Sequence, residues 1–168
     1  MALQAKIVGR EALTRRLNQI APNVEKYAAN AKYEIAQEAA DKMRDAAPRG
    51  ETLEYAESID GDFLRNRPGA HALPGANSTK DPSAAGIFAM FIWRFLEFGT
   101  SGHAIKPKLA KMLAFQAKDG EQAFVKSVKH PGSRAHPHLF PIWRAYKPQA
   151  RRKLLAAVNR GVREAMKK

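Results

Sequence analysis

The residues best suited to chemistry in this chain are its five histidines, His71, His103, His130, His136 and His138. Only His136 and His138 are close enough in sequence to share a metal ion, and Pro137 separates them in a predicted loop. The chain has no cysteine, and few acidic residues lie near this loop. Histidines that form hydrogen bonds or face solvent therefore explain the pattern better than a zinc site, and we predict no metal and no cofactor.

The patterns of nucleophilic catalysis and nucleotide binding are also missing. Ser101 precedes Gly102 and His103, but no Gly-x-Ser-x-Gly elbow surrounds it, and adjacency in sequence does not make a catalytic dyad. The stretches PGAHALPG and HPGSR contain neither a Walker-type Gly-Lys-Thr nor a GxGxxG pattern. We therefore predict that the protein is not an enzyme. A hydrolase that uses the histidine-rich loop is the last-ranked alternative, and it would lose activity in His136→Ala.

Length and composition predict one globular domain over residues 1–168. The chain has 168 residues, of which 45% are hydrophobic. Its longest apolar run, AAGIFAMFIW, is shorter than the roughly 20 residues of a spanning helix, so no membrane segment is expected. The N-terminus lacks the apolar core and cleavage site of a secretory signal, which predicts folding in the cytoplasm.

The positive charge is concentrated in one part of the chain. Residues 1–100 carry 13 Lys or Arg and 13 Asp or Glu, whereas residues 101–168 carry 16 and 3, which accounts for the net charge of +13. Such asymmetry is typical of a surface that meets phosphates, an acidic partner or a membrane face. A solubilising face without a specific partner remains the alternative.

Helical periodicity dominates the first 50 residues. Leu13, Leu17 and Ile20 recur at helical spacing before Pro22. A second apolar stripe predicts an amphipathic helix with Asn23 as its N-cap and an end near Ala46; its members are Val24, Tyr27, Ala28, Ala31, Ile35, Ala39, Met43 and Ala46. Pro48 and Gly50 then end the helix.

The middle of the chain combines predicted strands with loops. We interpret residues 58–66 as a strand, although the preceding residues also suit a short helical turn. Residues 67–85 predict a long loop or flap, and residues 86–98 a buried strand. Two apolar runs on either side of Asp119 and Gly120 predict a β-hairpin.

The last 30 residues predict a helix that is interrupted or bent at Pro148 and follows a loop over residues 129–138. One predicted side of this helix is apolar, with Trp143, Ala150, Leu154, Val158 and Val162. The candidate residues for binding DNA or a partner are basic: Arg151, Arg152, Lys153, Arg160, Arg163 and Lys167. Together these elements predict an α+β fold, an antiparallel sheet with a β-hairpin, flanked by a long N-terminal helix and a long basic C-terminal helix.

The order of several short motifs resembles a family of tailed-phage proteins. The first motif follows the long helix and comprises Pro48, Gly50 and Leu53, with Ser58 and Ile59 after it. The second is a Glu-Phe-Gly-Thr turn, Glu97, Phe98, Gly99 and Thr100, and the third is the Lys-His-Pro-Gly run Lys129, His130, Pro131 and Gly132, followed by Pro137 and Phe140. From Leu13 to the end, the chain resembles the head–tail connection or tail-completion (neck) proteins typified by the gene-ten product of phage Hong Kong ninety-seven.

This resemblance implies a virion or prophage structural protein that acts in head–tail joining or tail completion, as part of a ring around the DNA passage. The implied partners are further copies of the chain, other neck and tail proteins and, transiently, phage DNA, with assembly in the cytoplasm of the bacterial host. In the second motif, Glu97 would accept amide hydrogen bonds, Gly99 would adopt a backbone conformation that other residues resist, and Thr100 would close the turn with its hydroxyl.

A stand-alone basic module that binds nucleic acid is the competing hypothesis. It explains the charge but not the order of the motifs. The chain also lacks the interleaved aromatic and basic residues of a base-stacking platform, as well as helix-turn-helix and zinc-finger patterns.

Overall fold

The computed structural model describes residues 11–13, 15, 19, 22–50, 52–70, 72–74, 79–108, 110–116 and 120–167. The described chain divides into two compact units. The first combines the chain up to Met90 with the segment from Leu139 onward, and the second spans Phe91–His138. Within the described residues, no helix is long and apolar enough to cross a membrane.

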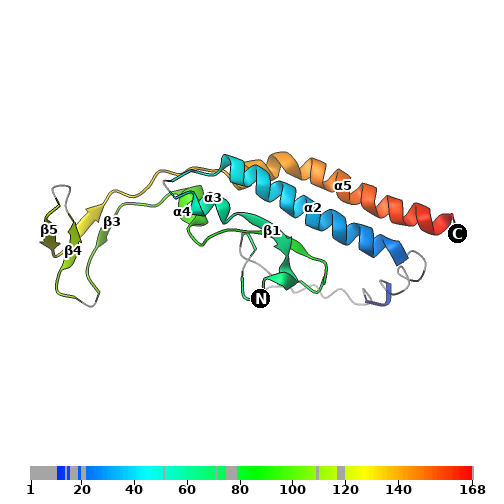
Figure 1. Cartoon of the computed structure of the whole chain (residues 1–168), viewed down its shortest axis with the longest axis horizontal. Coiled ribbons are helices and arrows are strands. Elements are labelled where there is room, and N and C mark those ends of the chain that lie inside the picture. The colour runs from blue at the N-terminus through cyan, green and yellow to red at the C-terminus, as the bar shows by residue number, and fades with distance from the viewer. Residues whose placement is uncertain are drawn as a thin grey trace, which may run out of the picture. The chain divides into compact units, whose positions relative to one another are not determined.

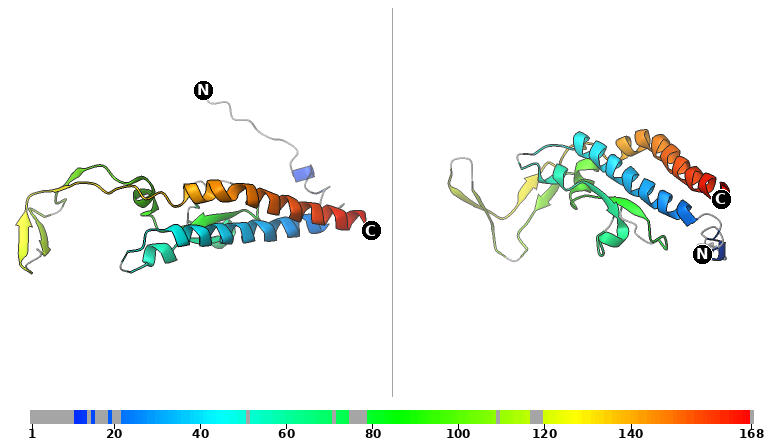
Figure 2. Two further views of the ribbon diagram at one scale, coloured as in Figure 1. Left: turned by 90° about the horizontal axis from the view of Figure 1, so that it is seen from above. Right: turned by 45° about the vertical axis from the view of Figure 1, so that its right-hand side comes forward.

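Two long helices form the framework of the first unit. Helix α2 spans Pro22–Ala46 and helix α5 spans Phe140–Met166. They lie side by side over most of their length, as the three ribbon views agree (Figures 1 and 2). This arrangement confirms the predicted α+β class and both long helices, including the end of the first one at Ala46.

The helix start and the interior proline differ from the sequence prediction. Asn23 lies inside α2 rather than capping it, and its side-chain amide donates to Glu164 over 2.8 Å. Helix α5 continues through Pro148 without interruption. Residues 11–13, 15 and 19 are helical, whereas Leu17 and Ile20, which were part of the same prediction, lie outside the described residues.

Small side chains allow α2 to approach its neighbours closely. Ala39 and Ala40 are almost completely buried, and Ile35 and Ala39 form one cluster with Tyr146 and Ala150 of α5. A stripe of alanines leaves room for the larger side chains of the facing helix, which fits the ridges-into-grooves rule for helix packing. The core of the first unit is therefore mainly a helix–helix interface.

A short antiparallel pair covers part of α2. Helix α3 (Glu54–Glu57) leads into β1 (Asp60–Phe63), a 3-10 turn η1 (Leu64–Asn66) follows, and β2 (Ala85–Phe88) pairs with β1. The predicted strand over 58–66 is thus shorter and begins after a helical turn. The loop predicted over 67–85 ends one residue earlier than expected, because Ala85 already pairs with Phe63.

The second unit begins with helix α4 (Trp93–Phe98) and continues as paired strands. Strand β3 (His103–Ile105) pairs with β6 (Val128–His130), and β4 (Leu113–Gln116) pairs with β5 (Gln122–Val125), all antiparallel. The predicted hairpin is therefore confirmed in its strands, and Gly120 has the positive φ of +87° that such turns favour; Asp119 lies outside the described residues.

The single buried strand predicted over 86–98 is wrong. Only its first residues belong to a strand, β2, whereas Trp93–Phe98 form α4. A short apolar run does not distinguish strand from helix by its period, and here the chain changes direction inside the run. The loop predicted over 129–138 also begins later, because Lys129 and His130 complete β6.

Candidate functional site

The face of α5 that packs against α2 is rotated relative to the predicted one. Tyr146, Ala150 and Gly161 are buried, while Val162, predicted to pack, is 41% exposed. A Cβ atom at Gly161 would lie 2.7 Å from Cα of Val24, so a glycine is needed where the helices come closest. Leu154, also predicted to pack, does lie against the buried cluster.

Lys153 belongs to the helix interface rather than to the free basic surface. Its ammonium pairs with Oε1 of Glu38 on α2, and Oε2 of the same carboxylate accepts the hydroxyl of Tyr146 over 2.8 Å. The hydrogen bonds from Lys153 and Tyr146 hold the pKa of the Glu38 carboxyl below its ordinary value. Burial and the hydrogen bond to Glu38 raise the pKa of Tyr146. One carboxylate thus joins two partners from the facing helix.

A second carboxylate performs the same task at the other end of the helix pair. Glu164 of α5 accepts the amide of Asn23 and the hydroxyl of Tyr27, each over 2.8 Å. The guanidinium of Arg160 lies 4.5 Å from the centre of the Tyr27 ring, which is a cation–π geometry. Arg160, predicted as a binding residue, is therefore engaged with α2.

The remaining predicted basic residues are exposed: Arg151, Arg152 and Arg163 lie on α5, and Lys167 directly follows its end. The Nε atom of Arg163 donates to the carbonyl of Asn159 within its own helix over 3.3 Å, which leaves its charge at the surface. These four side chains are the part of the predicted binding face that can meet phosphates.

The first unit also contains an apolar cavity of about 750 Å³ between α2, β2 and α5. Ile35, Ile87, Trp143 and Leu154 contribute to its walls, and the basic residues Lys147 and Arg151 are also among the lining residues. No sequence pattern pointed to this cavity, because its walls come from segments more than 100 residues apart.

The second unit brings two of the resemblance motifs together. Thr100 and Ser133 form an isolated antiparallel bridge, with backbone hydrogen bonds of 3.0 and 3.2 Å in the two directions. The Thr100 hydroxyl oxygen also accepts the Ser133 amide over 2.9 Å. Gly99 and Gly132 both have positive φ, +72° and +91°. A Cβ at Gly132 would lie 2.2 Å from the Thr100 carbonyl oxygen, so these glycines permit the two segments to approach.

Glu97 is buried at 3% exposure and bonds a residue far along the chain. Its Oε2 accepts the backbone N–H of His138 over 2.8 Å, and the His138 ring is buried beside it, with Nδ1 3.4 Å from the same oxygen. A buried carboxylate requires such partners. Glu97 therefore fastens the end of α4 to the segment that precedes α5, rather than holding only its own turn.

The remaining motif residues lie at the ends of helices and strands or in the segments that connect them. His130 ends β6, where its ring stacks on that of His103 with centroids 5.1 Å apart and its Nδ1 accepts the Gly132 amide. Pro131 is exposed beside it. Leu53, in the first unit, has a φ of +55° and precedes α3. Pro48 and Gly50 lie in the segment between α2 and α3, as expected for residues that end a helix.

The second unit exposes large apolar side chains that the sequence analysis had not identified as a surface. The described members with the greatest exposure are Phe91, Phe95, Phe98, Ile105, Met112, Phe115 and Phe124. The strand pairing places Phe115 with Leu113 on one face of the β4–β5 hairpin and Phe124 on the other. The presence of apolar residues on both faces of this hairpin was the sequence signal that could have indicated an exposed apolar surface.

Comparison with known proteins adds no assignment: no family model, no curated protein and no solved structure matches the chain. Among the described residues, no three His, Cys, Asp or Glu side chains are grouped to hold a metal ion. The features that can carry a function are therefore the basic surface of α5, the apolar cavity and the exposed apolar side chains of the second unit.

Proposed function

We propose that the protein is a structural component of a siphophage or prophage particle, acting in head–tail joining or tail completion as part of a ring around the DNA passage. The observation that carries the proposal is the exposure of seven large apolar side chains in the second unit. Exposed apolar surface is a common mark of an interaction site, and these side chains lie on α4 and on both faces of the β4–β5 hairpin. A protein that assembles with copies of itself and with neighbouring particle proteins has a use for it.

The architecture of the second unit supports an assembly role. Its strands form separate two-stranded pairs, β3 with β6 and β4 with β5. An isolated two-stranded hairpin is marginally stable in water and needs further strands or a packing partner. A partner that covers Phe115 and Phe124 would supply that missing packing.

The order of the three motifs gives the proposal its particular form. Two of them, Glu-Phe-Gly-Thr and Lys-His-Pro-Gly, meet at the Thr100–Ser133 bridge, where each contributes a glycine with positive φ. Their resemblance to the phage neck family is thus accompanied by a shared structural task. This supports a common fold element and, through it, a role at the neck or tail top.

The exposed arginines of α5 support the proposed DNA passage, because they offer positive charge to the DNA phosphates. Double-stranded DNA carries one charge per about 1.7 Å of helix axis, and a ring presents Arg151, Arg152 and Arg163 once per subunit. Charge reversal at these positions should impair DNA passage or assembly. Lys153 and Arg160 are unsuitable for this experiment, because reversing either one would also break its contact with α2.

The decisive experiment disrupts the gene in its phage or prophage and examines the lysate by negative-stain microscopy beside a complemented control. Separate full heads and tails, or tails of aberrant length, are the expected outcome. Normal infectious particles from the disrupted gene would overturn the proposal.

A stand-alone nucleic-acid-binding protein is the second candidate, favoured by the excess of 16 basic over 3 acidic residues in 101–168. It predicts a monomer whose DNA affinity falls steeply with salt. Titration of labelled duplex DNA at several salt concentrations, with the protein mass measured in parallel, separates it from the assembly role.

A further inference from the structure

A segment of the second unit and a segment of the first unit carry opposite net charge. Residues 91–138 contain eight Lys or Arg and three Asp or Glu, whereas residues 22–62 contain five and ten. The first set belongs to the second unit, and the second set forms α2, α3 and β1 of the first unit. The two segments therefore have net charges of equal magnitude and opposite sign.

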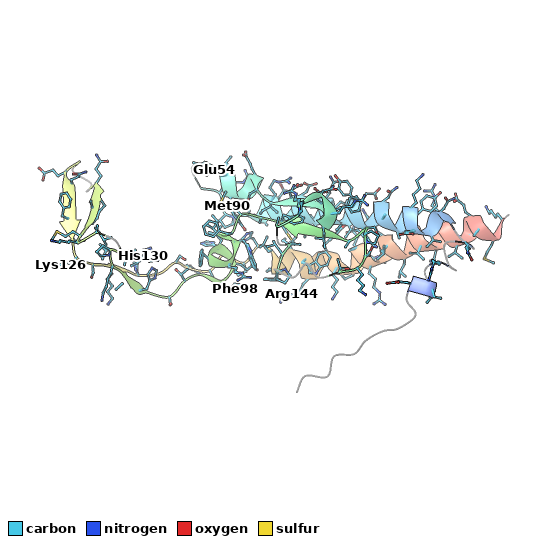
Figure 3. The ribbon with its side chains drawn as sticks, turned by 90° about the horizontal axis from the view of Figure 1, so that it is seen from below. Glu54, Met90, Phe98, Lys126, His130 and Arg144 are labelled. Carbon is cyan, nitrogen blue, oxygen red and sulfur yellow. The ribbon has the colours of Figure 1, made fainter. Side chains whose placement is uncertain are left out.

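The positive charge of the second unit is available for a partner. We define the ribbon as residues 103–130, from β3 to β6. Its described lysines are exposed: Lys106, Lys108, Lys111, Lys126 and Lys129. None of them forms an ion pair with another described residue. Four exposed apolar side chains lie among them: Ile105, Met112, Phe115 and Phe124. Lys126 and His130 mark the ribbon in Figure 3.

The negative charge follows one line along α2. Glu34, Glu38, Asp41 and Asp45 are spaced by three or four residues, which places them on one side of the helix. Glu38 is engaged with Lys153 and Asp41 with Arg44, and Glu34, Asp41 and Asp45 are exposed.

Helix α3 extends this acidic surface. Arg44 binds Asp41 over 2.6 Å and the carbonyl of Ile59 over 2.6 Å, which holds the end of α3 beside the last turns of α2. Glu54 and Glu57 of α3 are exposed there. We define the acidic face as Glu34, Asp41, Asp45, Glu54 and Glu57.

Exposed apolar side chains adjoin the acidic face. Leu53 directly precedes α3 and is 40% exposed. The amide of Met90 donates to the Ser58 hydroxyl over 3.1 Å, which places the exposed Met90 at the other end of α3. Glu54 and Met90 lie at the same end of the first unit in Figure 3. The surface thus combines acids with apolar groups, as the ribbon combines lysines with apolar groups.

We propose that the ribbon of one copy binds the acidic face of a second copy. The contact is heterologous, since the two surfaces differ, and a heterologous contact repeated from copy to copy generates a ring or an open chain of subunits. Opposite charges select this pairing and oppose ribbon–ribbon contact. The apolar cavity is a poorer receptor for the ribbon, because Lys147 and Arg151 would repel its lysines. The inference deepens the proposed function and rests on it, since it names the contact between neighbouring subunits of the proposed ring.

The test uses charge reversal on the full-length protein. The ribbon variant carries Lys126→Glu and Lys129→Glu, and the face variant carries Asp45→Lys and Glu57→Lys. Asp45 lies in the last turn of α2, where positive charge is compatible with the helix dipole, and Glu57 is the last residue of the one-turn helix α3. A control variant, Arg144→Glu with Lys147→Glu, makes the same change in net charge as the ribbon variant, on exposed positions of α5.

Sedimentation velocity over a range of protein concentrations gives the readout. We expect the unmodified protein and the control variant to associate, and each of the two test variants to associate at least about tenfold more weakly. An equimolar mixture of the ribbon and face variants should associate again, because each then offers the charge that the other needs. A chain that carries all four substitutions should do the same.

Three outcomes overturn the inference: a monomeric unmodified protein, test variants that associate as the control does, or no recovery in the mixture. Recovery in the mixture cannot come from misfolded variants, so a positive result does not depend on stability. Loss of DNA binding without loss of association in the ribbon variant would assign the lysines to DNA instead. Association of the pure protein is measured apart from particle assembly, so normal particles from a disrupted gene would overturn the proposed function and leave this inference standing.

Discussion

Two carboxylates join the long helices of the first unit, and both are placed so that each oxygen has its own partner. Glu38 bonds Tyr146 and Lys153, and Glu164 bonds Asn23 and Tyr27. Hydrogen bonds to an ionised group are stronger than those between neutral groups. These residues therefore set the register of the two helices more specifically than the alanine-rich core does.

The Glu38 cluster makes stability depend on pH at both ends of the range. Because the pKa of Glu38 is lowered by folding, its contribution is present at neutral pH and is lost as the pH falls from about 4 through the folded-state pKa. Because the pKa of Tyr146 is raised, its contribution is complete below about pH 10 and is lost above it. Urea unfolding of Glu38→Gln should show a smaller loss of stability between pH 6 and about 3 than the unmodified protein shows.

Tyr146→Phe tests the alkaline side of the same cluster and should reduce the loss above about pH 10. At neutral pH it should lower the free energy of unfolding by about 1.5 kcal/mol or more, since one hydrogen bond to a charged group is removed. The exposed Glu34→Gln serves as the control for Glu38→Gln. An acid limb that is unchanged in Glu38→Gln would contradict the assignment.

Gly61 is a residue at which a single added carbon should be strongly destabilising. A Cβ there would lie 2.3 Å from the carbonyl carbon and oxygen of Ala36, and these are backbone atoms that cannot rotate away. Gly61→Ala should lower the free energy of unfolding by about 2 kcal/mol or more, as β1 is displaced from α2. Chemical unfolding measures this, with Gly50→Ala as the matched control, because nothing lies within 4 Å of a Cβ at Gly50.

At the scale of elements, the paired segments of the second unit are held together by backbone hydrogen bonds rather than by side-chain packing. Between Gly99 and Ser133 the chain makes the Thr100–Ser133 bridge and two short strand pairs. The buried residues described in this unit are Trp93, Glu97 and His138, all near its two ends. No described residue of the ribbon is buried, so the ribbon should open before the helix pair does.

Gly132→Ala should loosen this unit specifically. The substitution combines a strained φ of +91° with a Cβ placed 2.2 Å from the Thr100 carbonyl oxygen. Amide hydrogen exchange over residues 99–138 should become at least about tenfold faster, a loss of about 1.4 kcal/mol or more, while α2 and α5 keep their protection. Gly102→Ala is the control, since its Cβ would lie 3.3 Å from the nearest atom and its φ is not positive. Equal effects of the two substitutions would argue against the role of Gly132.

At the scale of the whole molecule, the first unit depends on both ends of the chain. Helix α5 covers Ile35 and Ala39 of α2, although more than 100 residues separate them in sequence. Removal of residues 139–168 should therefore abolish cooperative thermal unfolding of the remaining chain, because the buried face of α2 would be exposed to water. Circular dichroism during heating measures this.

The matched change replaces residues 103–130 by a short Gly-Ser linker. It removes a similar number of residues but leaves the first unit intact, so cooperative unfolding should persist. The same deletion should abolish self-association if the ribbon is the binding element. Loss of cooperative unfolding in this variant would show that the two units are not separable in stability.

The sequence alone was sufficient for the features that local chemistry determines. The period of the apolar residues and Pro48 place the end of α2 near Ala46, and the Asp119–Gly120 pair indicates the hairpin whose strands are β4 and β5. The separation of charge along the chain also follows directly from composition. Each of these depends on neighbouring residues, whose conformational preferences act over a few positions.

Only the tertiary structure decided which basic residues are free and which surfaces lack a partner. Lys153 and Arg160 read as members of one basic face, but Glu38 and Tyr27, more than 100 residues away, engage them. The run over 86–98 changed from a predicted strand to a strand and a helix, since its period fits both. A side chain's environment is determined by segments distant in sequence, so helical periodicity can give a residue its side of a helix but not what lies against it.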